Sequence, residues 1–149
     1  MKRLLSLLLF VLCALYTAAP LSAFTPLEYY VSQVAGAGRG FKDGDFNEAR
    51  FNGPADISFD DTGKELFVAD QFNNRIRIIH LDQNNQVETL AGTGVSGTQD
   101  GPLSTATFNA PYSVIYIKGN LLVYDGGDHL LRWIDIKSGT VSTIGALPE

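Results

Sequence analysis

The chain has 149 residues, 45% of them hydrophobic, and carries 16 acidic and 11 basic residues, for a net charge of −5 at pH 7. No cluster of Lys or Arg interrupts this acidic balance, which disfavours nucleic acid as a partner because a phosphate backbone would be repelled. The single cysteine, Cys13, excludes an intramolecular disulfide framework and a zinc site built from cysteines. Stability must therefore come from packing.

Residues 1–23 have the pattern of a secretory signal peptide. Lys2 and Arg3 precede an apolar run over residues 4–19, and Leu21-Ser22-Ala23 offers a cleavage site. The apolar run is shorter than the roughly 20 residues of a spanning helix, which favours cleavage after Ala23 over an uncleaved signal anchor that would tether the chain to a membrane. We therefore expect a secreted protein with no stable membrane span, no cysteine and a net charge of −7.

The remaining sequence repeats itself. Phe-Asn-Gly-Pro-Ala-Asp-Ile-Ser-Phe at 51–59 returns as Phe-Asn-Ala-Pro-Tyr-Ser-Val-Ile-Tyr at 108–116, a spacing of 57. Leu-Phe-Val-Ala-Asp at 66–70 matches Leu-Leu-Val-Tyr-Asp at 121–125, a spacing of 55. A final element occurs three times, at 31–36, 87–92 and 141–146. Two repeats are complete, and a third is represented by its last strand alone.

Each repeat contains four short apolar stretches separated by Gly, Asn, Asp and Pro, as consecutive antiparallel strands do. We predict strands over 54–59, 65–69, 75–81 and 86–91 in the first repeat. The second repeat predicts strands over 111–117, 120–124, 130–136 and 140–145. In Arg75-Ile76-Arg77-Ile78 the isoleucines are expected on one face of a sheet and the arginines on the other.

A four-stranded unit that recurs at about fifty residues is typical of propeller blades, including the WD40 and kelch types. No Trp-Asp or Gly-His dipeptide stands at the relevant places, which argues against WD40. The motifs Ala-Gly-x-Gly, Asp-Gly, Ala-x-Phe-Asn-x-Pro, Val-Ala-Asp and Asn-x-Arg-Ile-Arg follow one another from Ala35 to Gly92, and their counterparts recur from Ala91 to Ala146. In this order they resemble the NHL repeat family.

The resemblance implies an all-β fold: a partial β-propeller of two four-stranded antiparallel NHL-type blades plus one orphan strand, after an N-terminal signal peptide. The expected division is a signal peptide at 1–23, the terminal strand of an incomplete blade at 24–36, blade 1 at 37–92 and blade 2 at 93–149.

Repeated positions are interpreted first as structural. Asp70 and Asp125 end a strand before a turn, where a carboxylate can accept bonds from turn amides. Arg77 and Arg132 are expected to bond a neighbouring carboxylate or carbonyl. These four side chains are also the candidate ligand or partner contacts.

The repeated aromatic residues are interpreted as core. Phe51 and Phe108 are expected to fill the interface between adjacent blades. The apolar or aromatic residues expected beside them are Ile57, Phe59, Val114 and Tyr116.

No catalytic or metal-ligating constellation is predicted. The Gly-rich segments at 35–40 and 91–97 are not followed by a helical pattern, as a dinucleotide fingerprint requires. Asp43-Gly44-Asp45 and Asp100-Gly101 leave calcium open, although the full calcium-loop pattern is missing. His80 and His129 stand at non-equivalent positions, and no serine has an elbow motif. No cofactor is predicted.

Two blades fall short of the four to eight that close a propeller, so apolar blade faces are expected to remain open and to associate. A truncated gene product, a piece of a longer chain and a self-assembling subunit all fit. The predicted function is non-enzymatic: a binding or scaffold module that contacts a protein or peptide through its propeller loops. The alternative is a piece of a metal-dependent six-bladed enzyme of the lyase or lactonase type, which this architecture also resembles.

Overall fold

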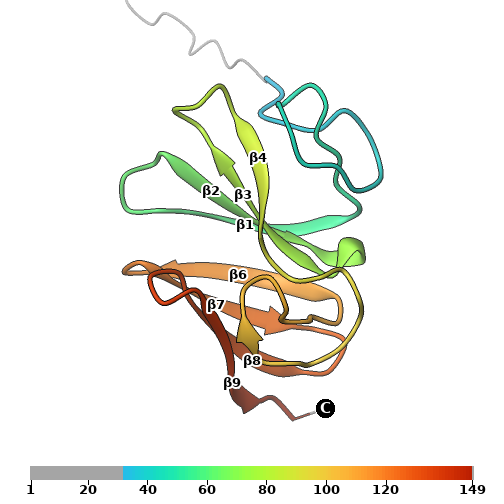
Figure 1. Ribbon diagram of the computed structural model, residues 1–149, viewed down its shortest axis with the longest axis vertical. Helices are drawn as coiled ribbons and strands as arrows, with labels where there is room; N and C mark the ends of the chain where they lie inside the picture. Colours follow the sequence, from blue (N-terminus) through green and yellow to red (C-terminus); the bar gives the residue numbers. More distant parts are fainter. Residues whose placement is uncertain (1–31, 149) are drawn as a thin grey trace, which may run out of the picture. The chain divides into compact units, whose positions relative to one another are not determined.

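In the computed structural model, residues 32–148 are described, and they form two antiparallel β-sheets (Figure 1). The first sheet has the order β1-β2-β3-β4 and the second β5-β9-β8-β7-β6. Among these described residues there is no helix long and apolar enough to cross a membrane. The predicted signal peptide at 1–23 lies outside the described residues, and so does most of the segment at 24–36.

The first sheet, blade 1, is a simple meander in which each strand pairs with the next. Its strands are β1 (Pro54–Phe59), β2 (Glu65–Asp70), β3 (Arg75–His80) and β4 (Gln86–Ala91), with a short 3-10 turn, η1 (Gln71–Asn73), between β2 and β3. Antiparallel pairing with tight turns is what period-2 apolar stretches separated by turn residues favour.

The second sheet, blade 2, repeats this meander with β6 (Pro111–Ile117), β7 (Asn120–Asp125), β8 (Leu130–Asp135) and β9 (Thr140–Ala146). A two-residue strand, β5 (Gly101–Pro102), adds to the edge of β9. In blade 1 the equivalent Gly44 makes only a bridge to Val87, through two backbone hydrogen bonds of 3.0 and 2.9 Å.

All eight long strands therefore fall where the sequence predicts them, to within a residue at each end. The orphan strand is corrected: residues 32–35, the described part of that element, form no strand. The equivalent strands β4 and β9 each pair with the third strand of their own blade. For residues 32–35, the described part of the chain contains no corresponding partner strand. Without a partner, a strand there would leave its backbone hydrogen-bonding groups unbonded.

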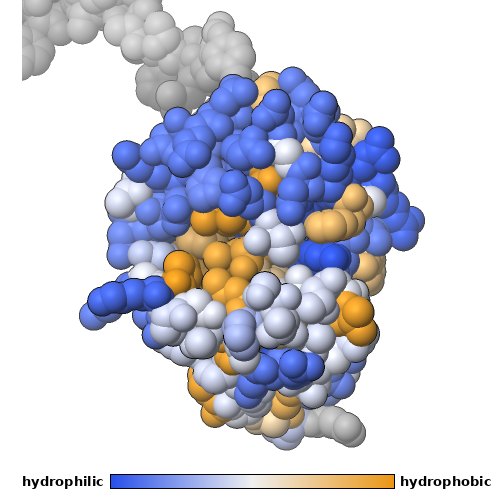
Figure 2. Space-filling view, viewed as in Figure 1, coloured by the Kyte–Doolittle hydropathy of each residue, from blue (hydrophilic) through white to orange (hydrophobic). Residues whose placement is uncertain are grey.

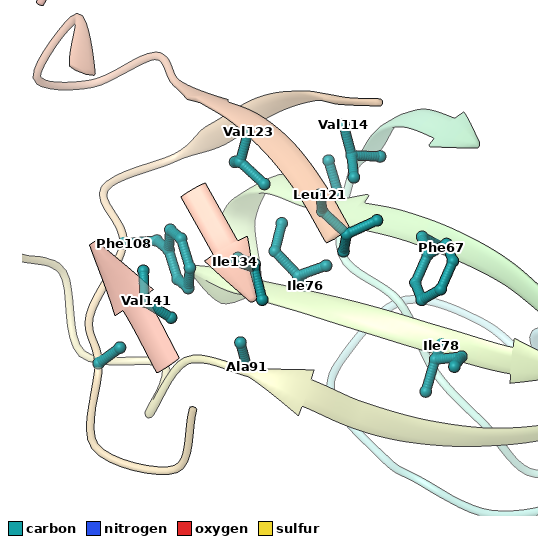
Figure 3. Packing of buried hydrophobic residues seen from close by; sticks show 12 residues of the cluster. Phe67, Ile76, Ile78, Ala91, Phe108, Val114, Leu121, Val123, Ile134 and Val141 are labelled. Carbon is teal, nitrogen blue, oxygen red and sulfur yellow. The ribbon is translucent and has the colours of Figure 1, made fainter. Parts of the chain in front are cut away.

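The main hydrophobic core lies between the two blades (Figure 3). Phe67, Ile76 and Ile78 of blade 1 point toward Leu121 and Ile134 of blade 2. Phe67 also stacks on Tyr116, with ring centroids 5.7 Å apart and planes inclined by 8°. Phe108, Val114 and Tyr116 thus hold the interface positions that the sequence predicts for them. Ile76 and Ile78 of β3 face this core, as the alternation predicts.

Polar bonds reinforce the contact between the innermost strands, β1 and β6. The Asp56 carboxylate accepts hydrogen bonds from the Ser113 hydroxyl at 2.7 Å and from the Val114 amide at 3.0 Å. The Ser58 hydroxyl accepts one from the Tyr116 amide at 2.9 Å. Side chains of one blade thus satisfy backbone donors of the next, which fixes the register between blades.

Each blade has an upstream face and a downstream face, named by the neighbour along the chain that each would meet. The upstream face of blade 2 is covered by blade 1, whereas no other blade within residues 32–148 covers the upstream face of blade 1. Ile57 and Phe59 are 55% and 53% exposed there, which corrects their prediction as interface core. Phe51 is half-buried in a smaller cluster on that same open face.

Apolar side chains also gather where the blades meet. Figure 2, in the orientation of Figure 1, shows an apolar patch in the middle of the molecule, in the region between the two sheets and flanked by polar surface. Contact between blades thus depends on apolar packing.

The repeat supplies a matched pair of substitutions for this arrangement. Phe108→Ala empties a fully buried position in the core between the blades, so we expect the free energy of unfolding to fall by about 3–5 kcal/mol. Phe51→Ala removes the equivalent ring from the open face, and the expected loss is less than about half as large. Urea denaturation at low protein concentration measures both, and equal losses would contradict the assignment of the two faces.

Candidate functional site

Each blade contains a buried arginine that holds two carboxylates, an arrangement named here the arginine clasp. In blade 1 the guanidinium of Arg77 on β3 donates to Asp70 Oδ2 at 2.8 Å and also bonds Asp43. Asp43 in turn accepts a hydrogen bond from the Thr89 hydroxyl on β4 at 3.0 Å. The clasp therefore joins three strands to the segment that precedes the blade.

The clasp of blade 2 has the same construction. Arg132 donates to Asp125 Oδ2 at 3.1 Å and to Asp100 Oδ1 at 2.8 Å. Thr143, the counterpart of Thr89, bonds Asp100 through its amide at 2.9 Å and its hydroxyl at 3.0 Å. Arginine is suited to this role because its planar group presents several donors in a fixed geometry.

Backbone carbonyls and aromatic rings complete each clasp. Arg77 donates to the carbonyls of Arg50 and Lys42, and Arg132 to those of Thr107 and Gln99. The Arg77 guanidinium lies 4.9 Å from the Phe51 ring centroid, and that of Arg132 lies 5.1 Å from the Phe108 centroid. In both arginines Nε is buried and has no partner among the described residues.

The clasps correct the predicted site. Asp70, Arg77, Asp125 and Arg132 are all fully buried, so they cannot touch an external partner. The prediction that the arginines bond carboxylates and carbonyls is confirmed. Asp70 and Asp125 accept the backbone amides of Asn52 and Asn109, which lie just before β1 and β6 of the same blade, each at 2.8 Å. In the turn after β2, the Asn73 side-chain amide also donates to Asp70 Oδ2 at 2.7 Å, as predicted for a turn amide.

Burial and bonding act in opposite directions on the carboxylates of the second clasp. Burial raises the pKa of Asp125 to about 6, although the Asn109 amide and Arg132 oppose this shift. Burial also acts to raise the pKa of Asp100, but the bonds from Thr143 and Arg132 outweigh it and hold that pKa below its usual value. Both shifts follow from the position of the carboxylates inside the clasp.

The clasps fix the turns at one end of the blades, named here the turn surface. Through Asp70 and Asp125 they hold the residues just before β1 and β6. A further bond ties the blades together at this end, because the Ala110 amide donates to Asn74 Oδ1 at 2.9 Å. Asn74 has a left-handed φ of 52°, a conformation that asparagine tolerates better than most residues. Hydrogen bonds from the interior of the blades thus hold the turns of this surface in place.

Exposed aromatic side chains stand on the turn surface. Phe72 in η1 is 60% exposed and Tyr112 on β6 is 57% exposed. Gly53 is required beside Phe72: it has a φ of 61°, and a Cβ there would lie 2.4 Å from the Phe72 ring. Between the blades lies a hollow of about 370 Å³. Its lining consists of Gln71, Ala110, Tyr112, Tyr124, Gly126 and Gly127.

The sequence interpretation missed this surface because it weighted positions that repeat. Phe72 corresponds to Gly127 and Tyr112 to Ala55, so these aromatic residues are where the two copies differ. A surface aromatic residue without a counterpart in the other repeat is the signal that could have identified them.

The titratable and hydroxyl side chains that the sequence singled out lie apart from one another in the described residues. Within residues 32–148, no three His, Cys, Asp or Glu side chains converge on a point where a metal could bind. His80 lies near Glu65 in blade 1, whereas His129 bonds the Tyr124 hydroxyl at 3.0 Å in blade 2. Ser58 and Ser113 bridge the blades, and Asp43 and Asp100 belong to the clasps.

Comparison with known proteins supports the repeat assignment. No family model matches the chain. The chain is 31% identical over 94 residues to human NHL repeat-containing protein 2 and 36% identical over 98 residues to the Arabidopsis thaliana protein SUPPRESSOR OF QUENCHING 1, chloroplastic. Each match covers 63% of this chain, but only 13% and 9% of the respective relative.

A solved structure agrees with the fold. A Bacteroides thetaiotaomicron protein of unknown function superimposes with a TM-score of 0.51 at 25% identity, over 72% of this chain and 25% of the other. The prediction of NHL-type propeller repeats is confirmed.

The clasp yields a stability prediction. Arg132→Met leaves Asp125 and Asp100 without their cation, and we expect the free energy of unfolding to fall by about 3–5 kcal/mol. Adding Asp125→Leu removes the buried charge and should restore much of that loss. Arg50→Met, at an exposed arginine, serves as the control and should change stability by less than about 0.5 kcal/mol. Urea denaturation of the three variants checks this, and a harmless Arg132→Met would contradict it.

Proposed function

Because the chain is built from NHL-type propeller blades, we propose that it is a secreted, non-enzymatic binding module whose turn surface holds a segment of a protein or peptide partner. The single observation that carries this proposal is the exposed Tyr112 in the lining of the hollow between the blades, with the exposed Phe72 next in sequence to another lining residue, Gln71. Aromatic anchors of this kind dominate the binding energy of protein interfaces. Self-association through the open blade faces forms a second part of the proposal.

Rigidity of the turn surface supports the proposal. The clasps and the Asn74 bond hold the turns before a ligand arrives, so little conformational entropy is lost when one binds. Tyr124 and Tyr112 both line the hollow: the Tyr124 hydroxyl is engaged by His129, whereas the Tyr112 ring is 57% exposed. The matching ligand is a short segment with an apolar or aromatic side chain that enters the hollow while its backbone stays in solvent.

The binding role is tested with peptides selected against the purified protein from a random phage-displayed library. We expect selected peptides to lose about tenfold or more in affinity when Tyr112 or Phe72 is replaced by alanine. Val95→Ala is the matched control, since Val95 is an exposed apolar residue in the loop between β4 and β5. Peptides that bind the two aromatic variants as tightly as the control variant would rule out the turn surface as the site.

Secretion rests on the signal-peptide pattern of residues 1–23. Protein recovered from the medium of a secreting host is expected to begin at Phe24, because cleavage follows Ala23. N-terminal sequencing measures this directly. Protein that stays with the membrane fraction and begins at Met1 would favour the signal anchor instead.

A further inference from the structure

We propose that copies of this chain associate head to tail, with the downstream face of blade 2 in one copy packed on the upstream face of blade 1 in the next. The inference deepens the self-association in the proposed function, and it does not depend on the turn surface. It follows from one feature of the described residues: the two faces that meet between blade 1 and blade 2 each occur a second time, and residues 32–148 leave both second copies without a neighbouring blade.

The first such face is the upstream face of blade 1. Leu66, Val68 and Ile79 form its cluster, and their counterparts in blade 2 are Leu121, Val123 and Ile134, which are fully buried against blade 1. Ile57 is 55% exposed while its counterpart Val114 is 1% exposed. Leu66, Val68 and Ile79 are only 3–5% exposed, but together with the exposed Ile57 they line a hollow of about 240 Å³, whereas their counterparts in blade 2 pack directly against blade 1.

The second such face is the downstream face of blade 2. In blade 1 the corresponding face places Phe67, Ile76 and Ile78 in the core between the blades. Their counterparts by strand register are Leu122, Leu131 and Trp133, all apolar and all only half-buried.

The edge strand of this face shows the same contrast. Ile144 is the counterpart of Leu90, which packs against the core; Ile144 itself is 56% exposed. Exposed apolar patches of this kind mark association surfaces.

The copy-to-copy contact differs from the contact between blade 1 and blade 2 in its polar bonds. Asp56 and Ser58 bridge to the amides of blade 2, whereas the equivalent positions in blade 2 are Ser113 and Ile115. An isoleucine cannot accept a hydrogen bond, and Ser113 already donates to Asp56. The contact between copies therefore depends more on apolar burial, and we expect it to be reversible with dilution.

Such a contact joins two different faces and is heterologous, so it closes into a ring only if the rotation between blades allows. Because propellers close with about four to eight blades, rings of two to four copies are expected. The expected species in solution are consequently discrete, with masses of two to four chains.

The test uses two glutamate variants on opposite faces and sedimentation velocity of the purified protein over a range of concentrations. Ile57→Glu blocks the upstream face and Ile144→Glu blocks the downstream face. Both residues are more than half exposed, so each variant is expected to fold. Each alone should behave as a monomer, with the dissociation constant raised at least tenfold. Mixed together, they should form a one-to-one dimer, because each supplies the face that the other lacks. Val95→Glu is the charge-matched control and should assemble like the unaltered protein.

Three results would overturn the proposal: an unaltered protein that stays monomeric at every concentration, a mixture that stays monomeric, or a loss of assembly in only one of the two variants, which would indicate contact between identical faces. Circular dichroism of each variant verifies that it is folded. Peptide binding at the turn surface is measured separately with the Tyr112→Ala variant, so failure of one proposal leaves the other standing.

Discussion

The fold depends on a buried guanidinium. Arg77 and Arg132 lie in the interior of their blades, where a charge is costly unless it is paired and hydrogen-bonded. Each therefore requires an aspartate at the end of the second strand and another in the segment before the blade. That requirement ties the preceding segment onto the sheet, seats Phe51 or Phe108 under it, and positions the first residues of β1 and β6. Turns, core and strand starts all follow from this one network.

The same network makes the two blades alike in their internal bonds. The blades differ in what packs against their faces. Each blade has its own clasp, but only the upstream face of blade 2 packs against another blade among the described residues. Each of the two faces of a propeller blade forms one side of an interface with a neighbouring blade, because a repeat buries its apolar faces only against other repeats. The association of blades is therefore part of the fold itself, while the turn surface, held by the clasps but built from non-repeated residues, is free to specialise.

Much of the fold could be predicted from the sequence, because the signals are local. Period-2 apolar stretches and turn residues such as Gly63 place every long strand, and the order of the motifs identifies the repeat. The short strand β5 was missed because Gly101 and Pro102 have no strand propensity and are held only by pairing with β9. The strand expected at 31–35 has the right residues, but the described residues contain no partner for it.

The candidate site was less predictable for a related reason. The predicted contact residues were the repeated polar side chains Arg77, Arg132, Asp70 and Asp125. These positions repeat because each blade requires the same buried ion pairs in its interior. Strand positions, the repeat and the pairing of arginine with carboxylate or carbonyl were determined by the sequence alone, since they depend on neighbours along the chain. Only the tertiary structure decided which equivalent residue is core and which is surface, as for Val114 and Ile57, because burial depends on what packs across the sheet.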